Sequence, residues 1–143
     1  MHERPHPSRN PPAYVPGQTP PCNFQDFGHA MLRGAEFDDV WGAFLNQFAR
    51  YRSASFFGYP PPDWIEPEYQ ALLAGTAECL TIEFDLPMPG WVDDPKYILP
   101  ELWLPWAWMV PADEESVQRL IAKAHPSYIN RNVIFEARNL IVI

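Results

Sequence analysis

Apolar residues recur at helical spacing in the first third of the chain. Between residues 36 and 52 they are separated by three or four positions, the period of one face of a helix. The positions on this face are Phe37, Val40, Trp41, Phe44, Leu45 and Phe48. Acidic residues open the stretch, and Arg50 and Arg52 close it, as the helix dipole favours. The pattern therefore predicts a helix over 36–52.

A second helix is predicted over about 67–84. Pro67 suits the first helical position, and Pro87 prevents the helix from continuing. Gly75 lies inside this stretch, where glycine lowers helix stability by about 1 kcal/mol relative to alanine. We therefore expect another element of the fold to pack closely against Gly75.

A third helix is predicted over 113–124. Asp113 is a good N-cap, and Glu114 and Glu115 fit the first turn. A narrow apolar face follows, made of Val117, Leu120, Ile121 and Ala124. Pro126 can then open one last short helical turn.

Prolines divide the rest of the chain. Residues 87–111 contain six prolines and four of the six tryptophans, so any helix there is limited to about a turn, with Asp94 capping the turn at Pro95. We expect an irregular wrap folded over the helices. The tail is β-prone and ends Leu-Ile-Val-Ile, which allows a short C-terminal strand and also self-association through these side chains.

Seven of the eighteen prolines fall within residues 1–21. Such a stretch favours extended, polyproline-like backbone. We therefore predict an extended Pro-rich arm over 1–34 and a single, mostly helical domain over 35–143. The predicted fold class is mainly α, a compact domain of three to four helices with the Trp/Pro-rich wrap.

The charge disfavours one class of partner and favours another. Ten basic and eighteen acidic residues give a formal charge of −8. Nucleic-acid binding needs clustered Lys and Arg, so a basic protein is the more suitable partner. No apolar run approaches the ~20 residues of a membrane span, and the first residues lack the order of a secretory signal. Cys22 and Cys79 are the only cysteines, so we expect reduced thiols and a cytoplasmic protein.

The sequence gives little sign of catalysis. No glycine-rich phosphate loop, nucleophile motif or metal-ligand spacing occurs, so we expect no cofactor and no metal. Helix capping and the helix dipole explain the pairs of adjacent acidic residues, which are Asp38–Asp39, Asp93–Asp94 and Glu114–Glu115. A hydrolase-type enzyme using Asp93 or Asp94 with His125 remains an alternative, as does a structural subunit anchored by the arm and the apolar tail.

Two features favour protein binding. Residues 11–14, Pro-Pro-Ala-Tyr, fit the pattern that WW domains bind. The second is a surplus of aromatic residues in short, Pro-broken segments, where some rings are expected to be exposed as interface anchors. These rings are Phe56, Phe57, Tyr59, Trp64, Trp91, Trp103, Trp106 and Trp108. A small core of Trp and Pro packed on each other explains the same surplus equally well.

Residues 84–103, FDLPMPGWVDDPKYILPELW, and 126–135, PSYINRNVIF, carry a resemblance. The chain resembles a family of small bacterial proteins with a helical N-terminal half, a "GLPxPxWxxDPxxFLxxPW" stretch and a C-terminal "SPxxFRxRNIF" segment. The matching positions are Leu86, Pro87, Pro89, Trp91, Asp94, Pro95, Tyr97, Leu99, Trp103, Pro126, Tyr128, Arg131, Asn132, Ile134 and Phe135. The resemblance implies a partner-binding role of the kind found in toxin–antitoxin-type operons.

Together, these observations predict a non-catalytic protein-binding module, antitoxin-like or immunity-like, that occupies and blocks a basic protein partner. The predicted partner-binding residues are Trp91, Asp94, Trp103, Trp106, Trp108, Arg131, Asn132 and Phe135.

Overall fold

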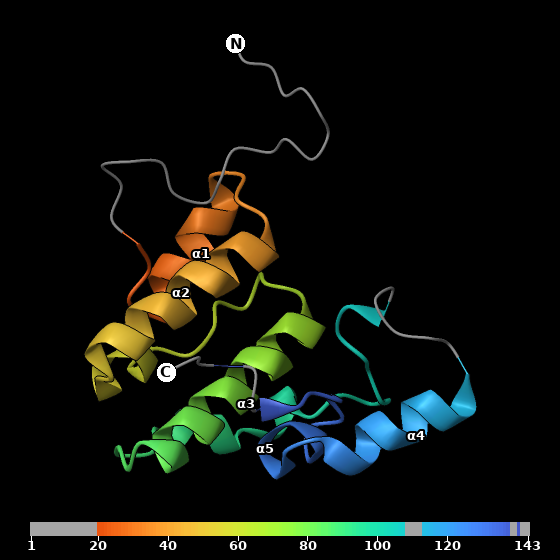
Figure 1. Cartoon of the computed structure of the whole chain (residues 1–143). Helices are drawn as coiled ribbons and strands as arrows, with labels where there is room; N and C mark the ends of the chain where they lie inside the picture. The colour runs from red at the N-terminus through yellow and green to blue at the C-terminus, as the bar shows by residue number, and fades with distance from the viewer. Residues whose placement is uncertain (1–19, 108–112, 138–139, 141–143) are drawn as a thin grey trace. The chain divides into compact units, whose positions relative to one another are not determined.

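The computed structural model of the chain describes residues 20–107, 113–137 and 140 (Figure 1). Its α-helices are α1 (Phe24–Leu32), α2 (Phe37–Tyr51), α3 (Pro67–Glu83), α4 (Glu114–Lys123) and α5 (Pro126–Ile129). Three 3-10 turns are η2 (Ala54–Phe57), η3 (Gly90–Asp93) and η4 (Pro95–Tyr97). The fold is therefore mainly α, as the sequence predicts.

The chain divides into two compact units. Unit 1 reaches to Pro62 and contains α1, α2 and η2, whereas unit 2 runs from Asp63 to Leu140 and contains the other elements. The division falls after the prolines at 60–62.

Helix α1 corrects part of the predicted arm. Residues 24–32 were expected to be extended, but they form a helix whose N-cap, Asn23, accepts a 2.8 Å hydrogen bond from the Asp26 backbone N–H. Phe24, Phe27 and Ala30 recur at helical spacing and are buried. The nearby prolines hid this short apolar stripe in the sequence. Residues 1–19 of the predicted arm lie outside the described part of the chain.

Phenylalanine rings form the core of unit 1. The ring of Phe44, on the buried face of α2, packs against Phe24 from α1 and against Phe56 and Phe57 from η2, with centroids 5.0–6.1 Å apart. All four are at most 3% exposed. The helix predicted over 36–52 is confirmed, and its apolar stripe is this core.

Helix α3 is the centre of unit 2. It is buried without a break from Ala71 to Ala77, as expected of a helix that is apolar all round. A Cβ atom on Gly75 would lie only 2.7 Å from Cδ1 of Tyr128 and 3.0 Å from the Ser127 carbonyl oxygen. The expected close packing at this glycine is thus confirmed, and the packing element is α5.

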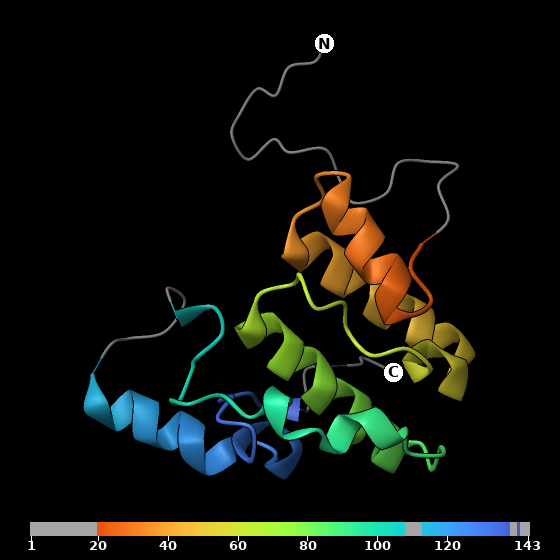
Figure 2. The ribbon, with the colours of Figure 1, turned by 180° about the vertical axis from the view of Figure 1, so that it is seen from behind.

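The Trp/Pro-rich segment packs on α3 through η3 and η4, and Figure 2 shows these turns in front of that helix. Asp94 caps η4, since its Oδ1 accepts a 3.0 Å hydrogen bond from the Lys96 backbone N–H. Up to residue 107 the irregular wrap is confirmed on α3, and so is its Asp94 cap. Packing of the wrap over the helix at 36–52 stays a prediction. Residues 108–112 lie outside the described chain.

The predicted C-terminal strand is reduced, within the described residues, to an isolated parallel bridge between Trp103 and Val133. The Trp103 N–H donates to the Asn132 carbonyl, and the Ile134 N–H donates to the Trp103 carbonyl. Leu140 is buried, and the last three apolar residues are outside the described part. No helix in the described ranges is long and apolar enough to cross a membrane.

Candidate functional site

A surface pocket in unit 2 brings charged residues from three elements together. Its volume is about 210 Å³. It lies between α3, the wrap and the end of α5, and is lined by Glu78, Val92, Asp93, Asp94, Ile98, Asn130 and Arg131.

Arg131 forms the inner wall of this pocket. Its side chain is 7% exposed and donates hydrogen bonds to Glu78 Oε1 (2.5 Å), to the Ser127 carbonyl (2.6 Å) and to the Val92 carbonyl (2.7 Å). These acceptors belong to α3, α5 and η3. A buried arginine with charge-assisted bonds to three elements fixes their relative positions within the unit.

The three carboxylates of the pocket have different surroundings. Glu78 is ion-paired with Arg131, and Asp94 is engaged as the cap of η4. Asp93 is exposed and has neither a hydrogen bond nor an ion pair within the described chain. With one guanidinium against three carboxylates, the lining carries a formal charge of −2.

The remaining wall is partly apolar. Val92 is 1% exposed, whereas Ile98, which follows η4, is 52% exposed beside the acidic groups. An exposed isoleucine next to carboxylates gives the pocket an apolar rim, a combination suited to long cationic side chains.

Two of the predicted binding residues, Asp94 and Arg131, line this pocket together. The next residue, Asn132, serves the fold of unit 2. It has a positive φ of 65°, and its Nδ2 donates to the Leu99 carbonyl. The Leu99 N–H in turn donates to the Arg131 carbonyl, so this segment holds the wrap in place.

The predicted aromatic anchors are half-buried and paired with other rings. Trp91 meets Tyr97 edge-on at 5.7 Å, and Trp103 meets Tyr69 at 5.8 Å. A third pair joins Trp106 and Phe135 at 5.9 Å.

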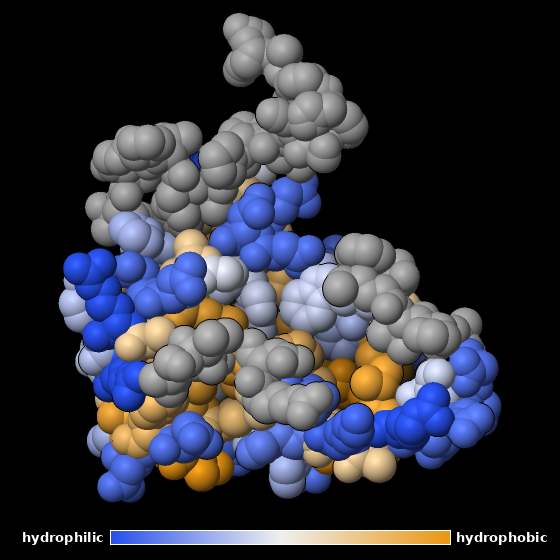
Figure 3. All heavy atoms as spheres, in the orientation of Figure 1, coloured by the Kyte–Doolittle hydropathy of each residue, from blue (hydrophilic) through white to orange (hydrophobic). Residues whose placement is uncertain are grey.

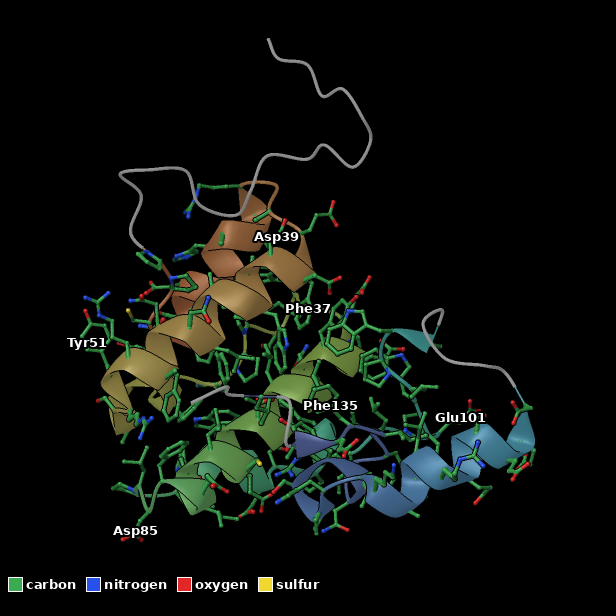
Figure 4. The ribbon with its side chains drawn as sticks, viewed as in Figure 1. Phe37, Asp39, Tyr51, Asp85, Glu101 and Phe135 are labelled. Atoms are coloured by element: carbon green, nitrogen blue, oxygen red, sulfur yellow. The ribbon has the colours of Figure 1, made fainter. Side chains whose placement is uncertain are left out.

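Phe135, which is labelled in Figure 4, also lies edge-on to Tyr128 of α5 at 5.0 Å. Trp108 is outside the described residues. The other predicted aromatics divide between core and surface, since Phe56 and Phe57 are buried whereas Tyr59 and Trp64 are about half exposed.

All of the excess negative charge belongs to unit 2. Residues 63–140 contain thirteen acidic and five basic side chains, a formal charge of −8, whereas residues 1–62 contain five of each. Ion pairs join Lys96 to Asp63, Arg119 to Glu115 and Arg131 to Glu78. In Figure 3 hydrophilic atoms cover the edge where α4 lies in Figure 1.

The end of α3 adds to this negative field. Glu83 closes the helix, Asp85 follows it, and the last turn has no basic residue. Asp85 lies beyond the helix end in Figure 4. Acidic groups at a helix C-terminus face its partial negative charge, which is unfavourable for folding and would be relieved by a bound cation.

Other reactive groups are used by the fold. Burial, followed by the nearby Glu83 and Glu78 carboxylates, raises the pKa of Cys79 to about 11, so its thiol is protonated at neutral pH. His125 does not line the pocket, and its Nδ1 accepts a hydrogen bond from the Ser127 N–H as the cap of α5. No cluster of three metal-ligating side chains occurs among the residues described.

No family model, curated protein or solved structure matches the chain. Sequence reasoning missed four pocket residues, namely Glu78, Val92, Ile98 and Asn130. Glu78 had a usable signal, because it is the one charged residue in the otherwise uncharged stretch 71–82. The other three left no such signal, since the fold alone brings them to the pocket.

Proposed function

We propose that the protein is a non-catalytic binding module, antitoxin-like or immunity-like, which occupies and blocks a basic protein partner. The observation that carries the proposal is the confinement of the whole −8 charge to unit 2. Several exposed carboxylates of that unit have no ion pair in the described ranges: Glu66, Glu68, Glu83, Asp85, Asp93 and Glu101.

The energetics of this surface support binding rather than folding. Unpaired like charges on one compact unit repel each other, and those at the end of α3 also oppose the helix dipole. A partner with a basic face would remove both penalties and would be steered to the surface by the field of the unit. Covering such a partner's active site is the simplest way for a protein without its own chemistry to inhibit it.

The hydrolase alternative has less support. It requires Asp93 or Asp94 to work with His125, whereas His125 is engaged as a helix cap outside the pocket and Asp94 is engaged as a turn cap. Asp93 alone is left without a defined partner for acid–base catalysis.

Salt-dependent capture tests the proposal. The tagged full chain is used to isolate partners from its native host at about 50 and about 500 mM salt, because screening weakens exposed charge pairs at the higher concentration. We expect a stoichiometric basic protein that is retained at low salt and released at high salt. Its affinity for the purified chain is then measured by calorimetry.

A matched pair of variants assigns the binding to unit 2. Glu83→Gln with Asp85→Asn removes two acidic charges there, and asparagine tolerates the positive φ of 55° at position 85. Asp38→Asn with Asp39→Asn removes two from unit 1. We expect only the first pair to weaken binding. Equal effects of both pairs, or a companion bound equally well at both salt concentrations, would contradict the proposal.

A further inference from the structure

We infer that the pocket at Glu78, Asp93 and Arg131 takes one arginine or lysine side chain of the partner together with a backbone carbonyl oxygen beside it. This inference rests on the proposed function and names the group that would be recognised. It is carried by the unused hydrogen-bonding capacity of the pocket, by its charge and by its size.

Arg131 supplies the first argument. A guanidinium has five N–H donors, and the structure uses three of them, two on Nη1 and one on Nη2. The remaining two have no acceptor in the described chain, although the side chain is only 7% exposed. Buried donors are nearly always paired, so these two indicate an acceptor that comes from outside the protein.

The carboxylates supply the second argument. Among the residues that the structure describes, the Asp93 side chain has no partner, and of the two Glu78 oxygens only Oε1 is bonded, to Arg131. A simple anion could accept from Arg131, but the lining charge of −2 would repel it. The ligand must therefore offer an acceptor and a cation together. A peptide segment does this with its carbonyl oxygen and a basic side chain.

The size of the pocket limits the ligand to about one side chain. Small-molecule and cofactor sites commonly have volumes of about 300–1,000 Å³. The volume here is about 210 Å³, and the exposed Ile98 lies at its edge. Lysine and arginine place their methylene groups on such apolar surface while the charged end reaches a carboxylate. The expected contacts are Ile98 with the methylene groups and Asp93 with the charge.

Three probes separate these requirements. The ¹⁵N-labelled full chain is titrated with acetyl-Gly-Arg-Gly-amide, with the same peptide carrying uncharged citrulline, and with ethylguanidinium, which has the cation but no carbonyl. We expect saturable NMR shifts centred on Asp93, Ile98 and Asn130 with the arginine peptide, at millimolar affinity. Ethylguanidinium should bind more weakly, and the citrulline peptide should cause no saturable shift.

A pair of variants completes the test. Asp93→Asn should weaken binding of the arginine peptide about tenfold, the loss expected for one charge-assisted bond. Asp39→Asn, at an exposed acidic residue of unit 1 outside the pocket, should leave binding unchanged. Equal shifts with the citrulline peptide, or equal losses in both variants, would overturn the inference.

The outcome is separable from that of the proposed function. If a basic partner binds in a salt-dependent way but the peptide does not bind at the pocket, the binding module stands and the pocket inference fails. If the peptide binds as expected but no basic partner is found, the proposed function fails instead.

Discussion

The two units are stabilised by different interactions. Unit 1 depends on apolar ring packing, with Phe44 in contact with rings from α1 and η2. Unit 2 has an apolar core around α3 and adds buried polar contacts between distant segments. Arg131 joins α3, α5 and η3, and the buried hydroxyls of Thr76 and Tyr128 are 2.8 Å apart.

The difference explains why the candidate site described above lies in unit 2. Ring packing is satisfied by the rings themselves and leaves no directional groups for a ligand. A polar network consists of hydrogen-bonding groups that need defined partners. A group of the network that lacks a partner inside the protein can therefore bind a ligand. In unit 2 the network reaches the surface at Arg131, beside the unpaired carboxylate of Asp93.

The largest effect is expected in the core of unit 1. Phe44→Ala should lower the free energy of unfolding by about 3–5 kcal/mol, because it removes a fully buried ring and leaves a cavity. Urea unfolding measures the change, and Phe44→Leu, which keeps most of the apolar volume, should cost less. A loss below about 1 kcal/mol would show that ring packing does not dominate unit 1.

A comparable but smaller effect is expected in unit 2. Arg131→Met keeps the length of the side chain but leaves Glu78 unpaired and two carbonyl oxygens without their donor. We expect the free energy of unfolding to fall by about 2–4 kcal/mol. This is less than the full cost of leaving a buried charge without its partner, because the Glu78 side chain is 26% exposed.

A double variant tests this reason for the loss. If the stranded carboxylate causes part of it, adding Glu78→Gln to Arg131→Met should recover stability, since the buried negative charge is gone. Arg131→Lys should fall between Arg131→Met and the unchanged protein, because it keeps the charge but cannot reach three acceptors at once. A double variant less stable than Arg131→Met alone would show that charge pairing is not the cause.

Much of the helical framework was predictable because its signals are local. Helices α2, α3 and α4 follow from apolar spacing and end residues, and the Asp94 and Asp113 caps follow from their positions. Gly75 was informative because its cost inside a helix required a reason. Helix α1 was missed because its short stripe lies next to a Pro-rich segment that predicts extended chain.

The pocket was far less predictable, because its residues are brought together by long-range contacts. Arg131 bonds to a glutamate 53 positions away in the sequence and to a carbonyl 39 positions away. No spacing rule connects such positions. The sequence identified Arg131 and Asp94 as residues of interest. Only the fold shows that Arg131 is mostly buried and that Asp93, which lines the same pocket, has no side-chain partner in the described part of the chain.

The smallest of the three effects is a pH dependence that belongs to unit 2. Burial raises the pKa of Cys79 from 9.0 to about 11, so its thiol ionises at a lower pH in the unfolded chain than in the folded protein. Between about pH 9 and 11 the unfolded state therefore binds fewer protons, and the free energy of unfolding falls as the pH rises. At about 1.4 kcal/mol per pH unit, the loss approaches about 2–3 kcal/mol.

Thermal unfolding followed by circular dichroism from pH 7 to 11 measures this loss, with Cys79→Ala and Cys22→Ala as the matched pair. Burial also raises the pKa of Tyr128, which adds a loss in the same direction above pH 10 in every variant. The Cys79 contribution is thus the difference between variants. We expect Cys79→Ala to flatten the profile and Cys22→Ala, a half-buried cysteine of unit 1, to leave it steep. Identical profiles in the two variants would contradict a Cys79 pKa that is raised by burial in the folded protein.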